Sequence, residues 1–218
     1  MAERPIFIPK KGYVDQCEVK FQWYPGFALS QKKKNVISLH QSAKDSYGID
    51  TILEISTKSN LSLGKSLSAF NLPFDTGLFV STVEAIYQGS KKFVGGGPYT
   101  DIYNYDAFRA KKDSRLKSSG DLVSFSFEGK EWPLSPLKGF YSWIYLKALS
   151  QNEEILPKLE GFNGFTDIEF NPKKAINCQA FCVAAFIVMN EKGIFPKVLN
   201  DREYFLEEIR LLDRGKLL

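Results

Sequence analysis

The sequence predicts an α+β fold: a mainly helical single domain with short β-strands and hairpins. Amphipathic stretches with helical spacing recur along the chain and end at glycine or proline. Short alternating stretches, bounded by turn-forming residues, predict strands between them. The chain has 218 residues, 44% of them hydrophobic, so it carries enough apolar mass to bury a core.

The first part of the chain alternates and then becomes helical. Residues 1–30 include "CEVKFQWYPGFAL", which predicts a strand interrupted at Pro25–Gly26. A helix is expected from about Ser30 to Gly48, with an apolar side made of Val36, Ile37, Leu39 and Ala43. A short strand in "DTILEIST" and a loop over residues 64–71 follow.

The middle of the chain combines hairpins with helices. A hairpin is expected around Asp75–Gly77, and a helix over Ser81–Val94 then leads into a glycine-rich loop. The stretch "YDAFRAKKDSRLKSSG" predicts a basic helix ending at Gly120. "DLVSFSFEGKEW" predicts a hairpin that turns at Glu128–Gly129.

The last part of the chain is helical. We expect helices in "SPLKGFYSWIYLKALSQ" and "NEEILPKLEGF", a buried helix ended by Gly193, and an amphipathic C-terminal helix with an Asn/Asp cap. Since no repeat or linker is evident, we expect one domain over residues 1–218. An N-terminal extension (1–64) would pack on a core (65–193), followed by a C-terminal helix (194–218).

Composition narrows the kinds of site. The formal net charge of +4 permits an anionic partner without requiring one. The single histidine, His40, excludes a multi-histidine metal site, and we expect it to have a packing or surface role. No metal and no cofactor is expected. The cysteines show no Cys-x-x-Cys pattern, which favours reduced thiols over disulfides or a zinc ribbon.

The same composition bears on location. The N-terminal stretch "MAERPIFIPKKG" lacks an apolar signal core, and the longest apolar run, Ala180 to Met189, is too short to span a bilayer. We therefore expect a protein of the reducing cytoplasm.

One predicted helix carries polar side chains at helical spacing. Within Ser81–Val94, the residues Glu84, Gln88 and Lys91 follow the spacing i, i+4, i+7 and would share one face. The plain alternative is a capping box, in which Ser81 is the N-cap, Glu84 is its carboxylate partner and Lys91 lies in solvent.

Three features are compatible with an anionic ligand. The glycines of "VGGGPYTD" (94–101) would let backbone N–H groups approach a phosphate, although glycines after a helix more often form a cap and a turn. The basic runs Lys32–Lys34 and Phe108–Lys117 would meet nucleic-acid phosphates or simply be solvated. "NPKKAIN" (171–177) precedes the buried helix, whose N-terminus is a further candidate phosphate contact.

Several stretches together resemble the NADAR family, small proteins associated with ADP-ribose and phosphorylated ribosides. "LSAFNLPF" (67–74) is similar to the family's "SNF"-like segment. "STVEAIYQGSKKF" (81–93) is similar to its helix of the form S/T-x-E-H-Y/F-x-Q-A-x-K-F. "KEWPLSPLKGFYSWIYLKALSQNEEIL" resembles a later tryptophan and helix, so the resemblance covers about residues 65–190.

The final family segment is matched only in part. In "FTDIEFNPKKAINCQAFCVAAF", Asp167 stands near the family glutamate and Asn177 matches the asparagine that begins a buried helix. The family's Trp-Gly pair is absent, and its Leu-Gly after the asparagine is replaced by Gln179–Ala180.

The resemblance implies a NADAR (YbiA-like) fold and assigns roles to matching residues. The family glutamate and lysine fall on Glu84 and Lys91, which we expect to be catalytic. The expected substrate contacts are Phe70, Asn71, Gln88, Gly95, Gly96, Gly97, Tyr99, Lys111, Asp167 and Asn177. Lys112 and Arg115 are alternatives to Lys111 as the cation beside a diphosphate.

The departures from the family pattern resemble the NADAR subgroup found beside DarT-type toxins. Those toxins place ADP-ribose on guanine in DNA, and the NADAR partner removes it. The resemblance therefore implies an antitoxin with ADP-ribosylglycohydrolase activity, which hydrolyses the N-glycosidic bond between ADP-ribose and guanine. Its partners would be ADP-ribosylated single-stranded DNA, ADP-ribose as product and a cognate toxin, with no membrane.

Two other functions stay open. One is an N-glycosidase that acts on a small phosphorylated riboside of the riboflavin-pathway type. The other is a non-catalytic antitoxin that binds ADP-ribose or nucleic acid.

Overall fold

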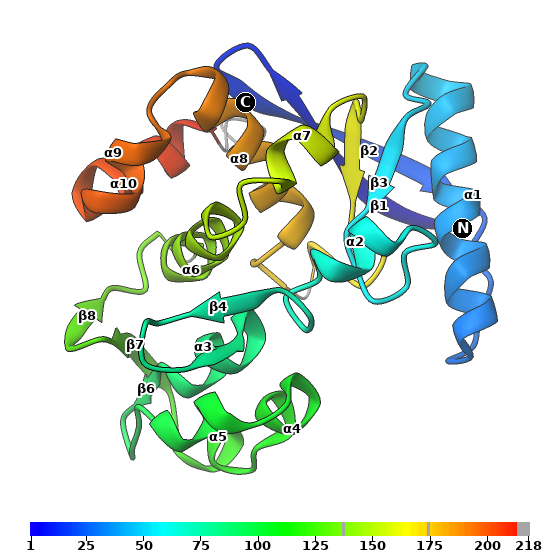
Figure 1. Cartoon of the computed structure of the whole chain (residues 1–218). Coiled ribbons are helices and arrows are strands. Elements are labelled where there is room, and N and C mark those ends of the chain that lie inside the picture. The colour runs from blue at the N-terminus through cyan, green and yellow to red at the C-terminus, as the bar shows by residue number, and fades with distance from the viewer. Residues whose placement is uncertain (137, 174, 213–218) are drawn as a thin grey trace. The chain divides into compact units, whose positions relative to one another are not determined.

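The computed structural model describes residues 1–136, 138–173 and 175–212, and the contacts divide the chain into two compact units (Figure 1). Unit 1 comprises Met1–Ser68 and Glu154–Leu218, and unit 2 comprises Ala69–Glu153. The first unit therefore joins both ends of the chain, whereas the expected segments followed the chain order 1–64, 65–193 and 194–218. The single domain with a packed extension stays a prediction.

Unit 1 contains one four-stranded sheet and most of the long helices. Its elements are β1 (Ala2–Lys10), β2 (Tyr13–Phe21), α1 (Leu29–Tyr47), β3 (Ile52–Glu54), α2 (Ser62–Ser66), α7 (Ile155–Leu159), β9 (Gly164–Thr166), α8 (Gln179–Glu191), α9 (Phe195–Asn200) and α10 (Arg202–Leu212). The expected C-terminal helix is confirmed as far as Leu212, capped by the Asp201 carboxylate, which accepts from Tyr204 N–H. Its residues 213–218 lie outside the described part.

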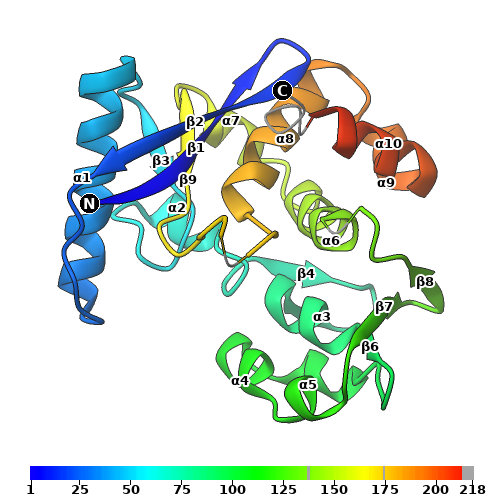
Figure 2. The same cartoon turned by 180° about the vertical axis from the view of Figure 1, so that it is seen from behind.

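The sheet of unit 1 has the strand order β2-β1-β9-β3 (Figure 2). β1 pairs with β2 along its whole length and with β9 at Phe7, and β9 runs parallel to β3. Because side chains alternate across a strand, Ile6 and Ile8 pack with α1 on one face while Phe7 contacts Phe181 of α8 on the other. Both faces are covered, which explains why residues 5–8 are all buried.

Helix α1 follows the expected pattern with one exception. It ends where Gly48 adopts φ +67°, a left-handed conformation that suits glycine, and the Gly48 N–H donates to Lys44 O. Val36, Leu39 and Ala43 are buried against the sheet, as expected. Ile37 was expected on the same side but is exposed, because a residue next to Val36 turns about 100° away from it.

Unit 2 contains two small sheets and short helices. Its elements are β4 (Pro73–Asp75), β5 (Val80–Thr82), α3 (Val83–Gly89), β6 (Lys91–Phe93), the 3₁₀ helix η1 (Thr100–Asn104), α4 (Ala107–Lys112), α5 (Arg115–Ser118), β7 (Leu122–Phe127), β8 (Lys130–Trp132) and α6 (Gly139–Ser150). The β4–β5 hairpin turns after Asp75 and the β7–β8 hairpin turns at Glu128–Gly129, as expected. Glu128 and Gly129 both have positive φ, as a two-residue hairpin turn requires.

Two expectations about short segments are wrong in part. Of the expected loop over residues 64–71, residues 64–66 belong to the helix α2 (Ser62–Ser66), while residues 67–71 form no helix or strand, as expected. The expected basic helix ending at Gly120 is two helices, α4 and α5, because the chain turns at Asp113. The Asp113 carboxylate accepts from both the backbone N–H and the side chain of Arg115, which stabilises that turn.

The expected helix over Ser81–Val94 is correct only from Val83 to Gly89, because Ser81 and Thr82 belong to β5. Beyond it, Lys91 to Phe93 form β6 and pair with β7, a strand that lies thirty residues further along the chain. Gly89 also packs so closely on Tyr103 that a Cβ there would lie 2.6 Å from the ring. Sheet pairing with a distant strand therefore overrides a local helical pattern.

The capping box on Ser81 is also wrong. Thr82 is the N-cap of α3, and its hydroxyl accepts from Ala85 N–H at 3.2 Å. The Ser81 hydroxyl instead donates to Tyr103 O. With these corrections, the fold class is confirmed as α+β, with more helix than strand.

Candidate active site

Glu84, Gln88 and Lys91 lie together in unit 2, although Lys91 is not on the helix. Gln88 follows Glu84 by one turn of α3, and its Nε2 donates to Glu84 Oε1 at 2.9 Å. Lys91 reaches back from β6 and its Nζ donates to Gln88 Oε1 at 2.7 Å. The Gln88 amide thus joins a carboxylate to an amine in one hydrogen-bonded chain, which fixes the orientation of both.

Glu84, Gln88 and Lys91 are more buried than polar and charged side chains usually are. Glu84 and Gln88 are 6% exposed, and Lys91 is half-buried. Charged side chains are buried in this way only when they are paired or hydrogen-bonded. The capping alternative, in which Lys91 lies in solvent, is therefore wrong.

Lys91 has a strongly altered proton affinity. Burial lowers its pKa from 10.5 to about 8, and the Lys111 cation adds to this shift while the Glu84 carboxylate opposes it. The Lys91 ammonium lies 4.7 Å from the centre of the Tyr87 ring, which itself packs against Phe125 and Tyr141. Tyr87 and the rings packed against it therefore help to exclude water from the Lys91 amine.

A second cation, Lys111, also lies close to Glu84. Lys111 of α4 places its Nζ 3.8 Å from Glu84 Oε1 and 5.0 Å from the centre of the Phe70 ring. Its side chain is 58% exposed, so it can meet a ligand. Phe70, an expected substrate contact, is therefore brought to the cluster, while Asn71 is exposed in the turn before β4.

The other candidate cations differ from Lys111. Arg115 makes hydrogen bonds to both Asp113 and Asp101, the latter through two nitrogens, and stacks over Tyr99. Two carboxylates neutralise it, so it is a poor diphosphate ligand. Lys112 is exposed on α4.

The glycine loop uses the N–H groups of Gly95 and Gly96 in backbone hydrogen bonds. Gly95 N–H donates to Ser119 O at 2.9 Å, and Gly96 N–H donates to Phe93 O at 3.3 Å. The Tyr99 hydroxyl is bonded to Ser119 Oγ at 2.5 Å. Both N–H groups therefore have backbone carbonyl partners in this conformation, and phosphate binding by Gly95 and Gly96 stays a prediction.

Gly97 packs closely against the backbone of Lys91. It has φ +84°, and a Cβ at this position would collide with the Lys91 carbonyl oxygen. Gly97 thus allows the chain to pass close behind the residue that carries the site amine.

We expect Gly97→Ala to lower stability more than Gly77→Ala does. Both glycines have similar positive φ, a strain that costs about 1–2 kcal/mol with a side chain. Gly77, at φ +81°, has open space around it, so it is a matched control. The additional clash in Gly97→Ala should cost about 1–3 kcal/mol more. Thermal melting measures the difference, and equal losses of Tm would contradict the close packing behind Lys91.

Asp167 and Asn177 belong to unit 1, not to the unit that carries Glu84 and Lys91. Asp167 is buried at the end of β9, and its carboxylate accepts from Glu169 N–H at 3.0 Å. Burial raises its pKa, opposed by a hydrogen bond from Gln179. Asn177 lies just before α8.

Unit 1 also holds a buried polar cluster that the sequence did not indicate. Glu54 of β3 is 2% exposed and accepts from Ser56 Oγ, Thr166 Oγ1 and Ile168 N–H. His40 Nε2 is bonded to the same Thr166 hydroxyl at 2.8 Å. Burial raises the pKa of Glu54 and lowers the pKa of His40 to about 4, so both favour the neutral form. The one feature of the sequence that could have predicted this cluster is the position of Glu54 within the largely apolar stretch "TILEIST".

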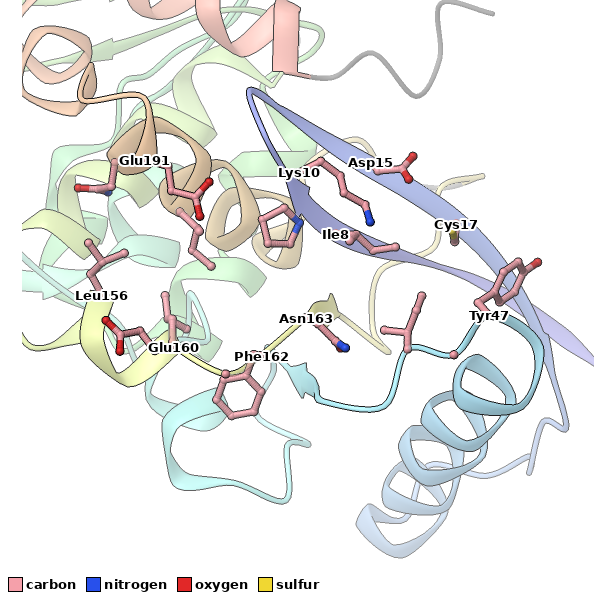
Figure 3. Close-up of a pocket in the computed structure, with 17 residues that line it drawn as sticks. Ile8, Lys10, Asp15, Cys17, Tyr47, Leu156, Glu160, Phe162, Asn163 and Glu191 are labelled. Atoms are coloured by element: carbon pink, nitrogen blue, oxygen red, sulfur yellow. The ribbon is translucent and has the colours of Figure 1, made fainter.

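A cavity of about 880 Å³ lies in unit 1 (Figure 3). Lys10, Asp15 and Cys17 of the β1–β2 hairpin line one side, and Glu160 and Asn163 of the α7–β9 connection line the other. Among the described residues that line it, none is a predicted site residue. It is a separate feature from the Glu84 cluster.

Over the described residues, no helix combines the length and the apolar character needed to cross a bilayer.

Comparison with known proteins adds one finding. A family model described as "DarT1-associated NADAR antitoxin" matches residues 2–216, nearly the whole chain. No curated protein matches the chain.

Proposed function

The chain belongs to the family of DarT1-associated NADAR antitoxins, and from this premise we propose that it removes ADP-ribose from guanine in DNA. The reaction is hydrolysis of the bond between ribose C1 and a guanine nitrogen. NADAR proteins are generally N-glycosidases, and an antitoxin that reverses the toxin's modification needs this chemistry. The observation that carries the proposal is the hydrogen-bonded chain Glu84–Gln88–Lys91, in which the amine has a pKa of about 8.

Lys91 is the proposed nucleophile. A lysine with a pKa of about 8 is about one-tenth neutral at pH 7, against roughly one part in several thousand for an ordinary lysine. Only the neutral amine has a lone pair for attack on carbon. Desolvation beside Tyr87 therefore serves catalysis.

The covalent step balances as follows. The Lys91 nitrogen forms a bond to C1 as the C1–guanine bond breaks with its electron pair going to the base, and one proton passes from the lysine nitrogen to guanine. The C1–O4′ bond then breaks as the lysine nitrogen forms a double bond to C1, and the second proton of that nitrogen passes to O4′, which leaves a Schiff base at C1. Water adds to C1 and releases ADP-ribose, which returns Lys91 to the amine.

Glu84 and Lys111 have supporting roles in this scheme. The Glu84 carboxylate stabilises the positive charge that develops at C1 and binds ribose hydroxyls. Lys111, exposed and 3.8 Å from Glu84, is positioned to pair with a phosphate of ADP-ribose. Phe70, Asn71 and Tyr99 are proposed as further substrate contacts in the same unit, while Asp167 and Asn177 are proposed on the resemblance alone.

The direct test is incubation with single-stranded DNA that carries ADP-ribosylated guanine. We expect free ADP-ribose and restored guanine, identified by mass spectrometry. Release from a phosphorylated riboside alone would favour the small-molecule N-glycosidase. Tight binding of ADP-ribose without turnover of either substrate would favour the non-catalytic antitoxin.

The pH dependence of cleavage separates the two possible roles of Lys91. A nucleophile must be neutral, so kcat/KM, which reports the pKa of the free protein, should rise as the pH increases and level off above a midpoint near pH 8. A lysine that acts only as a cation gives the opposite sign, because activity is lost above pH 8. Single-turnover rates between pH 6 and 9.5 measure this, with melting curves at each pH to show that the protein stays folded.

A further inference from the structure

Phe108 is an exposed aromatic side chain on a short basic helix. It lies in α4 and is 60% exposed, whereas its helix neighbours Ala107 and Ala110 are buried. α4 packs on α3 and Ala110 lies in a buried cluster with Ala85, so Phe108 is not needed for this contact. Its ring is therefore open to solvent and can meet a ligand.

Phe108 continues the aromatic and basic surroundings of the Glu84 site. Its ring meets the Phe70 ring edge to face, with centroids 4.9 Å apart. Lys111 lies over Phe70 and 3.8 Å from Glu84, which connects the ring pair to the candidate catalytic group. Lys112 follows on the same helix and is exposed.

Aromatic rings beside lysines suit one class of ligand in particular. Bases stack on aromatic faces, and lysines pair with the phosphates of the same strand. A base can stack on a protein ring only when it is unstacked from its own neighbours, which favours a single strand over a duplex. A protein partner fits less well, because lysine is depleted in protein interfaces.

We propose that Phe108 and Phe70, with Lys111 and Lys112, form a platform that stacks a base of single-stranded nucleic acid beside the Glu84–Lys91 site. This deepens the proposed function, because it rests on a nucleic-acid substrate and gives the strand a place to lie.

The test is binding of an unmodified, fluorescently labelled single-stranded oligonucleotide, followed by anisotropy at low salt. Because stacking on an aromatic side chain is worth about 1–3 kcal/mol, Phe108→Leu should weaken Kd by about 5- to 150-fold. Phe108→Tyr keeps the ring and should stay within about twofold of the wild type. Leu78→Ala removes another exposed apolar side chain of unit 2, 92% exposed in the β4–β5 turn, and is the matched control.

Two further results bear on the proposal. Lys112→Gln should reduce the slope of log Kd against log salt by about 0.7, the loss of one phosphate contact on a single strand. Equal affinity for duplex and single strand, wild-type affinity in Phe108→Leu, or a loss as large in Leu78→Ala would overturn the platform. Because the oligonucleotide is unmodified, failure of ADP-ribose release would refute the glycohydrolase and leave the platform standing.

Discussion

Lys91→Met is expected to abolish release of ADP-ribose, with at least about a 1,000-fold fall in kcat, because it removes the nucleophile and keeps an apolar stem of similar length. The half-buried position beside Tyr87 favours this replacement over a polar one, so the variant should stay folded. Single-turnover cleavage of modified single-stranded DNA, together with thermal melting, measures both properties.

Lys91→Arg distinguishes a nucleophilic lysine from one that acts only as a cation. Arginine keeps the cation but is never neutral in proteins, so it cannot attack carbon. If Lys91 is the nucleophile, both variants are inactive. If it only pairs with a phosphate, Lys91→Arg keeps much of the wild-type kcat while Lys91→Met loses it, and the covalent scheme is wrong.

Glu84→Gln should lower kcat by about 100- to 1,000-fold, because it removes the negative charge that stabilises C1 while keeping the shape of the side chain. A second effect follows from the contacts. The Glu84 carboxylate opposes the fall in the pKa of Lys91, so its removal should move the midpoint of the pH profile below 8. A purely structural role for Glu84 would not move this midpoint.

Glu131→Gln is the matched control for Glu84→Gln. Glu131 is exposed and pairs with Lys92, the neighbour of Lys91 on β6. This variant should keep both kcat and the midpoint, because no buried charge changes. Retention of wild-type kcat in Glu84→Gln, or equal losses in both variants, would remove Glu84 from the site.

Local patterns predicted the parts of the fold that local chemistry decides. The hairpin turn has positive φ at Glu128 and Gly129, and α1 ends at the left-handed Gly48, so a glycine marks the turn or the helix end in both places. The end of α3 could not be predicted in this way. Lys91 to Phe93 leave the helix because β7 offers backbone pairing from a distant part of the chain.

For the candidate site, the sequence predicted one contact correctly and placed one residue on the wrong element. Helical spacing placed Glu84 and Gln88 on one face correctly, and their side chains are hydrogen-bonded. Lys91 was expected on the same face of the helix, but it joins them from the strand β6, and Gln88 bridges it to Glu84. Burial lowers the pKa of Lys91, and burial depends on Tyr87, Phe125 and Tyr141, which only the folded unit brings together.

Contacts that form only in the folded protein also decide the roles of the glycine loop and of Glu54. The composition "GGG" allows N–H groups to approach a ligand, but the Gly95 N–H donates to Ser119 O and the Gly96 N–H to Phe93 O. Glu54 lies in an apolar strand, and its partner Thr166 is more than a hundred residues away in the sequence.

The proposed mechanism depends on a covalent bond between Lys91 and the ribose, and reductive trapping tests this most directly. Sodium borohydride, added while wild-type protein turns over ADP-ribosylated single-stranded DNA, should reduce the Schiff base and fix ADP-ribose to the protein. Digestion and mass spectrometry should then place the adduct on Lys91 and on no neighbouring lysine, Lys92 included. Full turnover with no adduct, or an adduct that survives Lys91→Met, would contradict the account.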